Sequence, residues 1–190
     1  HAGSGADPIE EEVTRRRIWD PLVRLGHWTL VGGIAAAWIT RHAEGRIHEW
    51  LGYLPLAVVA LRLGWGFVGT THARFGDFVR PPGETWRYAR ELLRGREPRH
   101  LGHNPLGGWM ILMLLGLTAL CAGSGWLYTT DRFWGVAWVD RLHRTSTDAL
   151  LAAAALHVAG VLLASWRHRE NLVAAMIHGD KRDDRRAGVE

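Results

Sequence analysis

Four long apolar segments dominate this sequence and constrain its fold more than any other feature. Each runs for about the 20 residues that a helix needs to cross a hydrocarbon layer roughly 30 Å thick. They extend approximately over residues 22–40, 47–69, 105–129 and 142–166, with polar connections between them. The sequence therefore predicts an all-α integral membrane protein, a four-helix bundle that forms a single domain over residues 1–190.

Tryptophan supports the membrane interpretation. Eleven tryptophans are many for 190 residues, and most stand near the ends of the apolar segments. An amphipathic indole ring prefers the headgroup level of a bilayer. The overall hydrophobic fraction is only 47%, because very polar tails and connections dilute the apolar segments. We therefore expect a chain that is surrounded by membrane lipid.

Positive charges are divided unevenly among the tails and connections. Arginine and lysine are frequent in residues 1–17, in the connection between the second and third spans, and in residues 167–190. The other two connections hold fewer cations, namely Arg41, Arg46, Arg132, Arg141 and Arg144. By the positive-inside rule, residues 1–17 and 167–190 are predicted to be cytoplasmic tails. Because membrane topology accounts for the distribution of the arginines, no nucleic-acid partner is predicted.

The single cysteine limits the cofactors that the chain can hold. Cys121 lies inside an apolar segment. Covalent c-type haem needs a C-x-x-C-H motif, and an iron–sulfur cluster needs several thiolates. Neither can be built from one cysteine, and an intramolecular disulfide is excluded as well.

Four of the eleven histidines fall in the spans or at their ends, where polar side chains are costly unless they have partners. His143 and His157 share one predicted helix, on which they lie about 40° apart around the axis and about 21 Å apart along it. The helix directions place His143 level with His48 near the outer surface, and His157 level with His27 toward the cytoplasm. Each level then offers two imidazoles from different helices, as bis-histidine ligation of a b-type haem requires.

Other interpretations of these polar residues stay open. A lone membrane histidine can serve as an interhelical hydrogen-bonding group, whereas zinc needs a third ligand that neither level clearly supplies. Arg62 lies inside the second span on the same face as His48, and it reaches the inner level. We expect Arg62, with Arg24 as a second candidate, to bind a haem propionate, and snorkelling to the interface is the alternative.

Several motifs occur together along nearly the whole chain. They are Ile18 to Pro21 with Arg24, His27 and Trp28; His48, Gly52, Arg62 and Trp65; and His157 followed by Arg169 to Leu172, Met176 to Gly179 and Lys181. In these motifs the chain resembles the bacterial cytochrome b561 family, which includes the b-type cytochrome subunits of membrane-bound nickel–iron hydrogenases. The resemblance implies two non-covalent haems b, with His27 and His157 on the inner iron and His48 and His143 on the outer iron. It also implies electron exchange with quinone in the bacterial inner membrane.

The resemblance leaves the second electron partner open. We expect a respiratory electron carrier between quinone and a periplasmic redox protein, with a hydrogenase among the candidates. That partner would dock on Phe133, Trp134, Val136 and Trp138, for which an ordinary aromatic belt is the alternative. A quinone-linked superoxide oxidase, for which Arg132, Arg141 and Arg144 are suggestive, is a second function. A non-redox membrane scaffold is a third. No catalytic residue or quinone site is predicted, and a homodimer is left open.

Overall fold

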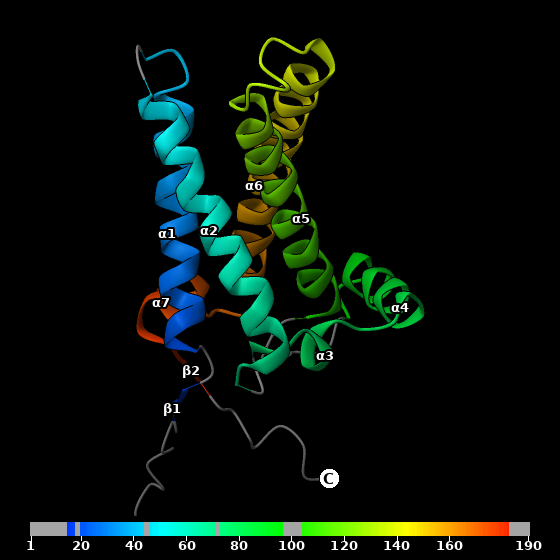
Figure 1. Cartoon of the computed structure of the whole chain (residues 1–190). Coiled ribbons are helices and arrows are strands. Elements are labelled where there is room, and N and C mark those ends of the chain that lie inside the picture. The colour runs from blue at the N-terminus through cyan, green and yellow to red at the C-terminus, as the bar shows by residue number, and fades with distance from the viewer. Residues whose placement is uncertain (1–14, 18–19, 44–45, 71–72, 97–103, 183–190) are drawn as a thin grey trace, which may run out of the picture.

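Two antiparallel helical hairpins stand side by side in this protein (Figure 1). The computed structural model describes residues 15–17, 20–43, 46–70, 73–96 and 104–182. The first hairpin consists of α1 (Pro21–Ile39) and α2 (Ile47–Val68), and the second of α5 (Pro105–Tyr128) and α6 (Ala137–Arg167). All four helices are long and apolar enough to cross a membrane. The prediction of an all-α fold with four membrane helices is thus confirmed.

The helix bounds match the predicted spans within one residue for α1, α2 and α5, but not for α6. The last span was predicted over residues 142–166, whereas α6 begins at Ala137. Asp140 in its first turn suits the positive end of the helix dipole, and Arg144 forms an ion pair with it at 3.0 Å. Local electrostatics therefore favour helix in residues 137–141, which the predicted span left in the connection before it.

Side-chain caps determine where α1 and α5 begin. Asp20 accepts hydrogen bonds from the backbone N–H groups of Leu22 at 2.8 Å and Val23 at 3.3 Å. Asn104 accepts one from Gly107 at 2.7 Å. Each cap satisfies N–H groups that have no partner within the helix, and the proline that follows each cap has a fixed φ suited to the first turn.

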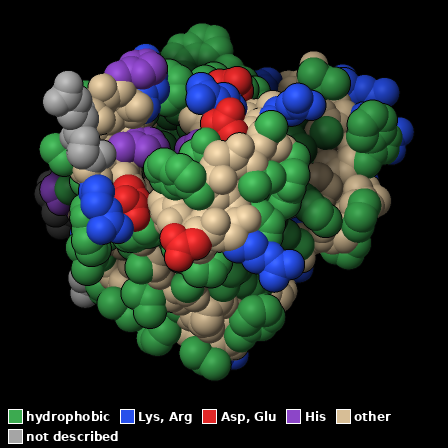
Figure 2. Space-filling view, turned by 45° about the horizontal axis from the view of Figure 1, so that its top comes forward, with side chains coloured by type: hydrophobic (Ala, Val, Ile, Leu, Met, Phe, Trp, Pro, Cys, Tyr) green, Lys and Arg blue, Asp and Glu red, His purple; other side chains and the backbone are tan. Residues whose placement is uncertain are grey.

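The bundle core is small, because most of the helix surface faces outward. The helices of each hairpin pack on each other, and α2 also packs on α5 to join the hairpins. Gly33 lets α1 approach α2 closely, since a Cβ there would lie 3.3 Å from the Pro55 ring. Val59 and Val139 are fully buried. Figure 2 shows a mainly hydrophobic surface over the lower part of the view, with charged side chains spread over its upper and central parts, and an apolar surface of this kind suits contact with lipid.

The connection between the hairpins contains two helices, α3 (Phe75–Phe78) and α4 (Pro82–Leu93). Residues 84–93 are by their sequence able to form a short surface helix, and the structure has α4 there, whereas nothing in the sequence indicates α3. A Cβ at Gly108 would lie 2.6 Å from the Phe78 carbonyl oxygen. Glycine at this position therefore allows α3 to lie directly against the first turns of α5.

Both ends of the described chain lie at the same end of the bundle (Figure 1). Strand β1 (Arg15–Arg17) pairs antiparallel with β2 (Asp180–Arg182), and α7 (Leu172–His178) precedes β2. The sequence had indicated only tails before the first span and after the last. Asn171 caps α7 by accepting a hydrogen bond from the Ala174 N–H at 2.9 Å, and Gly179 ends it with φ 93°. Residues 1–14 and 183–190 of the predicted tails lie outside the described residues, as do Ile18 and Trp19.

Candidate functional site

Two histidines face each other near the end of the bundle where the termini lie. His27 of α1 and His157 of α6 have ring centroids 6.5 Å apart, with an interplanar angle of 58°. Trp28 borders this inner pair, its ring lying edge-on to His27 at 5.1 Å. The Nδ1 atom of His27 is buried and has no hydrogen-bond partner among the described residues. The sequence had predicted that these two histidines come together, and the structure confirms their proximity.

A second pair of histidines lies toward the opposite end of the bundle. His48 of α2 and His143 of α6 have ring centroids 6.1 Å apart, with an interplanar angle of 80°. The Nδ1 atom of His48 lies 2.8 Å from the Ala37 carbonyl oxygen, and that of His143 lies 2.9 Å from the Cys121 carbonyl oxygen. An Nδ1–H that donates to a carbonyl leaves Nε2 free as an acceptor or metal ligand. This outer pair was also predicted, but its carbonyl partners were not.

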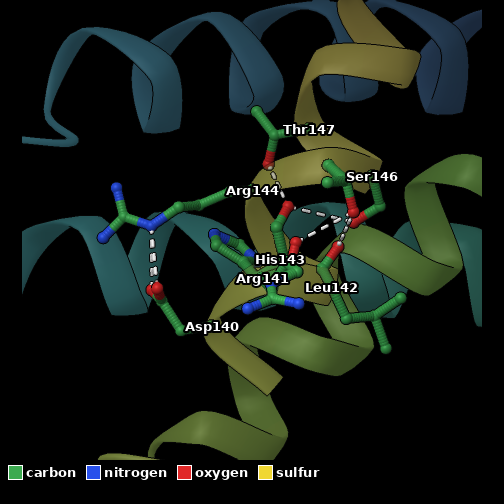
Figure 3. A network of polar contacts seen from close by, with 8 residues as sticks. Asp140, Arg141, Leu142, His143, Arg144, Ser146 and Thr147 are labelled. Carbon is green, nitrogen blue, oxygen red and sulfur yellow. Dashed lines mark hydrogen bonds and ion pairs between the residues drawn. The ribbon is translucent and has the colours of Figure 1, made fainter. Parts of the chain in front are cut away.

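Polar contacts hold the turn of α6 that carries His143. Thr147 Oγ1 and Ser146 Oγ donate to the His143 carbonyl oxygen at 2.8 and 3.0 Å (Figure 3). The thiol of Cys121 lies 3.1 Å from Thr147 Oγ1, and so it contacts the same turn from α5. Sequence reasoning had used Cys121 only to exclude cofactors.

A glycine of α5 provides the space that the His143 ring occupies. A Cβ at Gly125 would lie 3.0 Å from His143 Cε1 and 3.1 Å from its Nδ1. Those distances are shorter than ordinary van der Waals contact, so a Cβ at this position would require the ring to shift by a few tenths of an ångström. A glycine in a membrane span indicates close helix contact, but not which side chain fills the space beside it.

Arg62 lies at the inner end of the bundle with an incomplete set of partners. Its Nη2 donates to the Ala73 carbonyl oxygen at 3.0 Å, while its Nη1 is buried without a partner among the described residues. Its guanidinium also lies 4.9 Å from the Phe75 ring centre. Since a buried donor is costly when unpaired, this Nη1 favours an acceptor that comes from outside the described chain.

The negative group nearest to this arginine was missed by sequence reasoning. Asp20 is 9% exposed and interacts electrostatically with Arg62. Burial would raise the pKa of Asp20, but hydrogen bonds from Thr70 and from the N–H groups of Val23 and Leu22 bring that pKa below its ordinary value. Asp20 is therefore ionised at neutral pH. The position of Asp20 directly before the first apolar segment indicates a helix cap, but it does not indicate that the carboxylate lies near the positive charge of Arg62.

Arg24, the second candidate for a propionate, lies on α1 one turn before His27 and contacts α7. Its Nη2 donates to the Ile177 carbonyl oxygen, and Trp28 Nε1 lies 3.4 Å from the Met176 carbonyl oxygen. These bonds hold α7 against the first two turns of α1. An open groove of about 630 Å³ runs beside them, lined by Pro21, Arg24, Leu25, Trp28 and Ile177. The Nε atom of Arg24 is buried and unpartnered among the described residues.

Aromatic side chains cover the loop between α5 and α6. Trp134 is 71% exposed and stacks on Tyr128 with ring centroids 5.7 Å apart. Trp138 is 55% exposed and lies edge-on to Phe133 at 5.9 Å. The loop and the first turn of α6 thus present one exposed indole ring each, at the end of the bundle nearest to the outer histidine pair.

Comparison with known proteins gives one match. A family model described as prokaryotic cytochrome b561 matches residues 18–179, which is most of the chain. Neither the curated proteins nor the solved structures contain a match.

Proposed function

This chain belongs to the prokaryotic cytochrome b561 family, and from that premise we propose that it holds two haems b, each between two histidines, and passes electrons between quinone and a periplasmic redox partner. Family membership and the four apolar helices make the protein a multi-pass bacterial membrane cytochrome of the b type that transfers electrons. The number of haems, their ligands and the electron partners are the proposed part.

The spacing of the histidine pairs is the observation that supports the proposal best. Metal–imidazole bonds are about 2 Å long, so two imidazoles on opposite sides of one metal ion have ring centres roughly 6 Å apart. The inner pair is separated by 6.5 Å and the outer pair by 6.1 Å. In the described residues no three His, Cys, Asp or Glu side chains form a group that could hold a metal ion. Two facing imidazoles at each level are the donor set that a haem iron uses.

The outer pair also has the surroundings that a ligating histidine requires. His48 and His143 each direct Nδ1 at a backbone carbonyl, which orients the ring and favours the tautomer with a free Nε2. In each pair α6 provides one histidine and the first hairpin provides the other. The residues that would hold the outer haem are therefore His48 and His143, and those that would hold the inner haem are His27 and His157.

When bound, haem iron supplies reversible one-electron chemistry. The protein's own part is to fix the two levels about 21 Å apart along α6, by its 1.5 Å rise per residue, and to surround them with a low-dielectric bundle. Arg62 would donate hydrogen bonds to a propionate at the inner level, where its Nη1 is buried without a partner in the described chain. A cation there favours the reduced, less positive haem.

Replacing Arg62 with leucine is expected to lower the midpoint potential of the inner haem by about 60 mV, which corresponds to the loss of about 1.4 kcal/mol in a one-electron couple. The change removes a positive charge that stabilises the reduced haem. Potentiometric titration of the purified protein measures this shift. Arg62→Lys should keep most of the potential because it keeps the charge, and Arg87→Leu on the exposed surface of α4 should leave it unchanged. An unaltered inner potential in Arg62→Leu would contradict the propionate role.

The distribution of charge supports an orientation in the bacterial inner membrane. The end of the bundle that carries both termini also carries the arginine-rich connection, with Arg74, Arg80, Arg87, Arg90, Arg94 and Arg96 among the described residues. By the positive-inside rule this end is cytoplasmic, so the outer histidine pair lies on the periplasmic side. Trp134 and Trp138 would then face the periplasm, where a redox protein such as a hydrogenase would dock.

The quinone-linked superoxide oxidase remains the second candidate, but the structure favours it less. That function would be served by free cationic groups around the outer level, to attract an anion. Arg144, one of the three arginines that suggested this function, forms an ion pair with Asp140 at 3.0 Å. Transfer to a docked partner accounts better for the exposed indole rings of the same loop.

A pyridine haemochrome assay on detergent-purified protein tests the proposal. The expected result is about two haems b per chain and a reduced-minus-oxidised spectrum of six-coordinate, low-spin haem. Reduction by a quinol in anaerobic stopped-flow experiments should then precede oxidation by the added partner. One haem per chain, or high-spin haem, would refute the arrangement with two histidines on each of two haems. If none of the quinols tested reduced the protein, the quinone role would be refuted.

A further inference from the structure

Helix α4, in the connection between the two hairpins, has an apolar side that stays largely exposed in the described chain. Pro82, Trp86, Ala89 and Leu93 recur at the three- and four-residue spacing that aligns side chains on one face of a helix. Trp86 is 66% exposed and Leu93 is 88% exposed. Figure 1 shows α4 projecting sideways from the bundle near the start of α5.

Part of this apolar face forms one wall of a groove. The groove has a volume of about 390 Å³ and is lined by Pro82, Thr85, Trp86 and Ala89 of α4 and by Leu106 and Trp109 of α5. Leu106 and Trp109 belong to the first turns of a membrane-spanning helix. The groove therefore lies at the level where the chain enters the hydrocarbon layer, a level that indole rings also prefer.

Specific contacts hold α4 in place, so the groove is already formed in the folded protein. On the side of α4 away from the groove, Tyr88 is only 5% exposed. Arg167, at the end of α6, donates from Nη1 to the Leu92 carbonyl oxygen at 3.2 Å. Trp109 Nε1 donates to the Arg80 carbonyl oxygen at 3.0 Å, which ties the segment before α4 to α5.

Positive charges lie along one side of the apolar face. Arg87, Arg90 and Arg94 are exposed and lie roughly 80–140° around the helix from Pro82, counting 100° per residue. An apolar face bordered by cations is typical of a helix that lies in the membrane interface and attracts anionic headgroups.

The position and the charge of the groove distinguish between occupants. It lies at the boundary of the hydrocarbon layer beside three exposed arginines, a combination that suits the acyl chain and the phosphate of an anionic phospholipid. We propose that the groove between α4 and α5 binds an acyl chain of an anionic phospholipid, and that the arginines of α4 hold its phosphate.

Native mass spectrometry of the haem-loaded full chain tests this proposal with two lipids that share the same acyl chains, phosphatidylglycerol and phosphatidylcholine. The wild-type protein is expected to retain a phosphatidylglycerol adduct at a lipid concentration at least about tenfold lower than it needs for phosphatidylcholine. Replacing Arg87, Arg90 and Arg94 together with glutamine should abolish that preference. Ala89→Phe, which fills the groove, should reduce the retention of both lipids.

Controls separate this site from general charge and from folding. Replacing Arg41, Arg132 and Arg144 with glutamine removes the same charge at the other end of the bundle and should leave the preference unchanged. The haem spectrum, recorded on every variant, reports the fold independently of the lipid. Equal retention of the two lipids by the wild-type protein would overturn the proposal. The proposal would also be overturned if the preference for phosphatidylglycerol survived in the triple variant of α4. The same holds if Ala89→Phe displaced phosphatidylcholine from a protein that showed no headgroup selectivity.

Discussion

The His48→Ala variant is expected to contain about one haem b per chain where the wild-type protein contains about two, because an iron with one imidazole ligand binds more weakly. The inner pair should be unaffected, since His27 and His157 lie on different turns about 21 Å from the outer level. The pyridine haemochrome assay measures the loss, and electron paramagnetic resonance shows which low-spin signal disappears.

His42→Ala is the matched control for this experiment. His42 is exposed in the turn between α1 and α2, six residues before His48 in the sequence. We expect this variant to keep both haems. If His48→Ala also kept two low-spin haems, the assignment of the outer pair would be wrong, whereas a loss of haem in His42→Ala would point to a ligand that the helix pairing does not include.

The Gly125→Val variant is expected to lose most of its outer haem even though no ligand is changed. A Cβ at this position would lie 3.0 Å from His143 Cε1, so a branched side chain must push the ring away from His48. Replacement of a small buried residue by a larger one costs typically about 1–3 kcal/mol, which is enough to displace an imidazole that is bonded to a carbonyl. The optical spectrum of the reduced protein and its haem content measure this effect.

Gly123→Val provides the comparison on the same helix. A Cβ at Gly123 would meet no atom within 4 Å, so both haems should be retained. Equal loss in the two variants would indicate that α5 tolerates no valine in this turn, and the specific role of Gly125 would then be refuted. Retention of both haems by Gly125→Val would refute it as well.

The membrane helices and the histidine pairing could be predicted because both follow from regular geometry. Apolar segments of spanning length indicate helices, and the fourteen residues between His143 and His157 place two side chains on one helix face at two depths. The 6.5 and 6.1 Å centroid separations confirm that each histidine of α6 meets the predicted neighbour. Their role as haem ligands stays a prediction.

The remaining features depend on packing between segments far apart in the chain. The acceptors for the Nδ1 atoms are backbone carbonyls of Ala37 and Cys121, and every residue has a carbonyl, so no sequence signal marks them. Asp20 reads as a helix cap, and its effect on Arg62 arises only when α1 and α2 pack together. Strands of three polar residues, such as β1 and β2, carry no periodic pattern that could have revealed their pairing.

The helix order of the histidine pairs determines when the protein can acquire its cofactors during biosynthesis. Both pairs depend on α6, the last of the four membrane helices to be translated, whereas His27 and His48 belong to the hairpin that is made first. Neither pair exists until α6 has been translated and inserted beside the earlier hairpin. Under the proposed ligation, haem is bound only after the second hairpin has joined the first, and its binding connects two hairpins that enter the membrane one after the other.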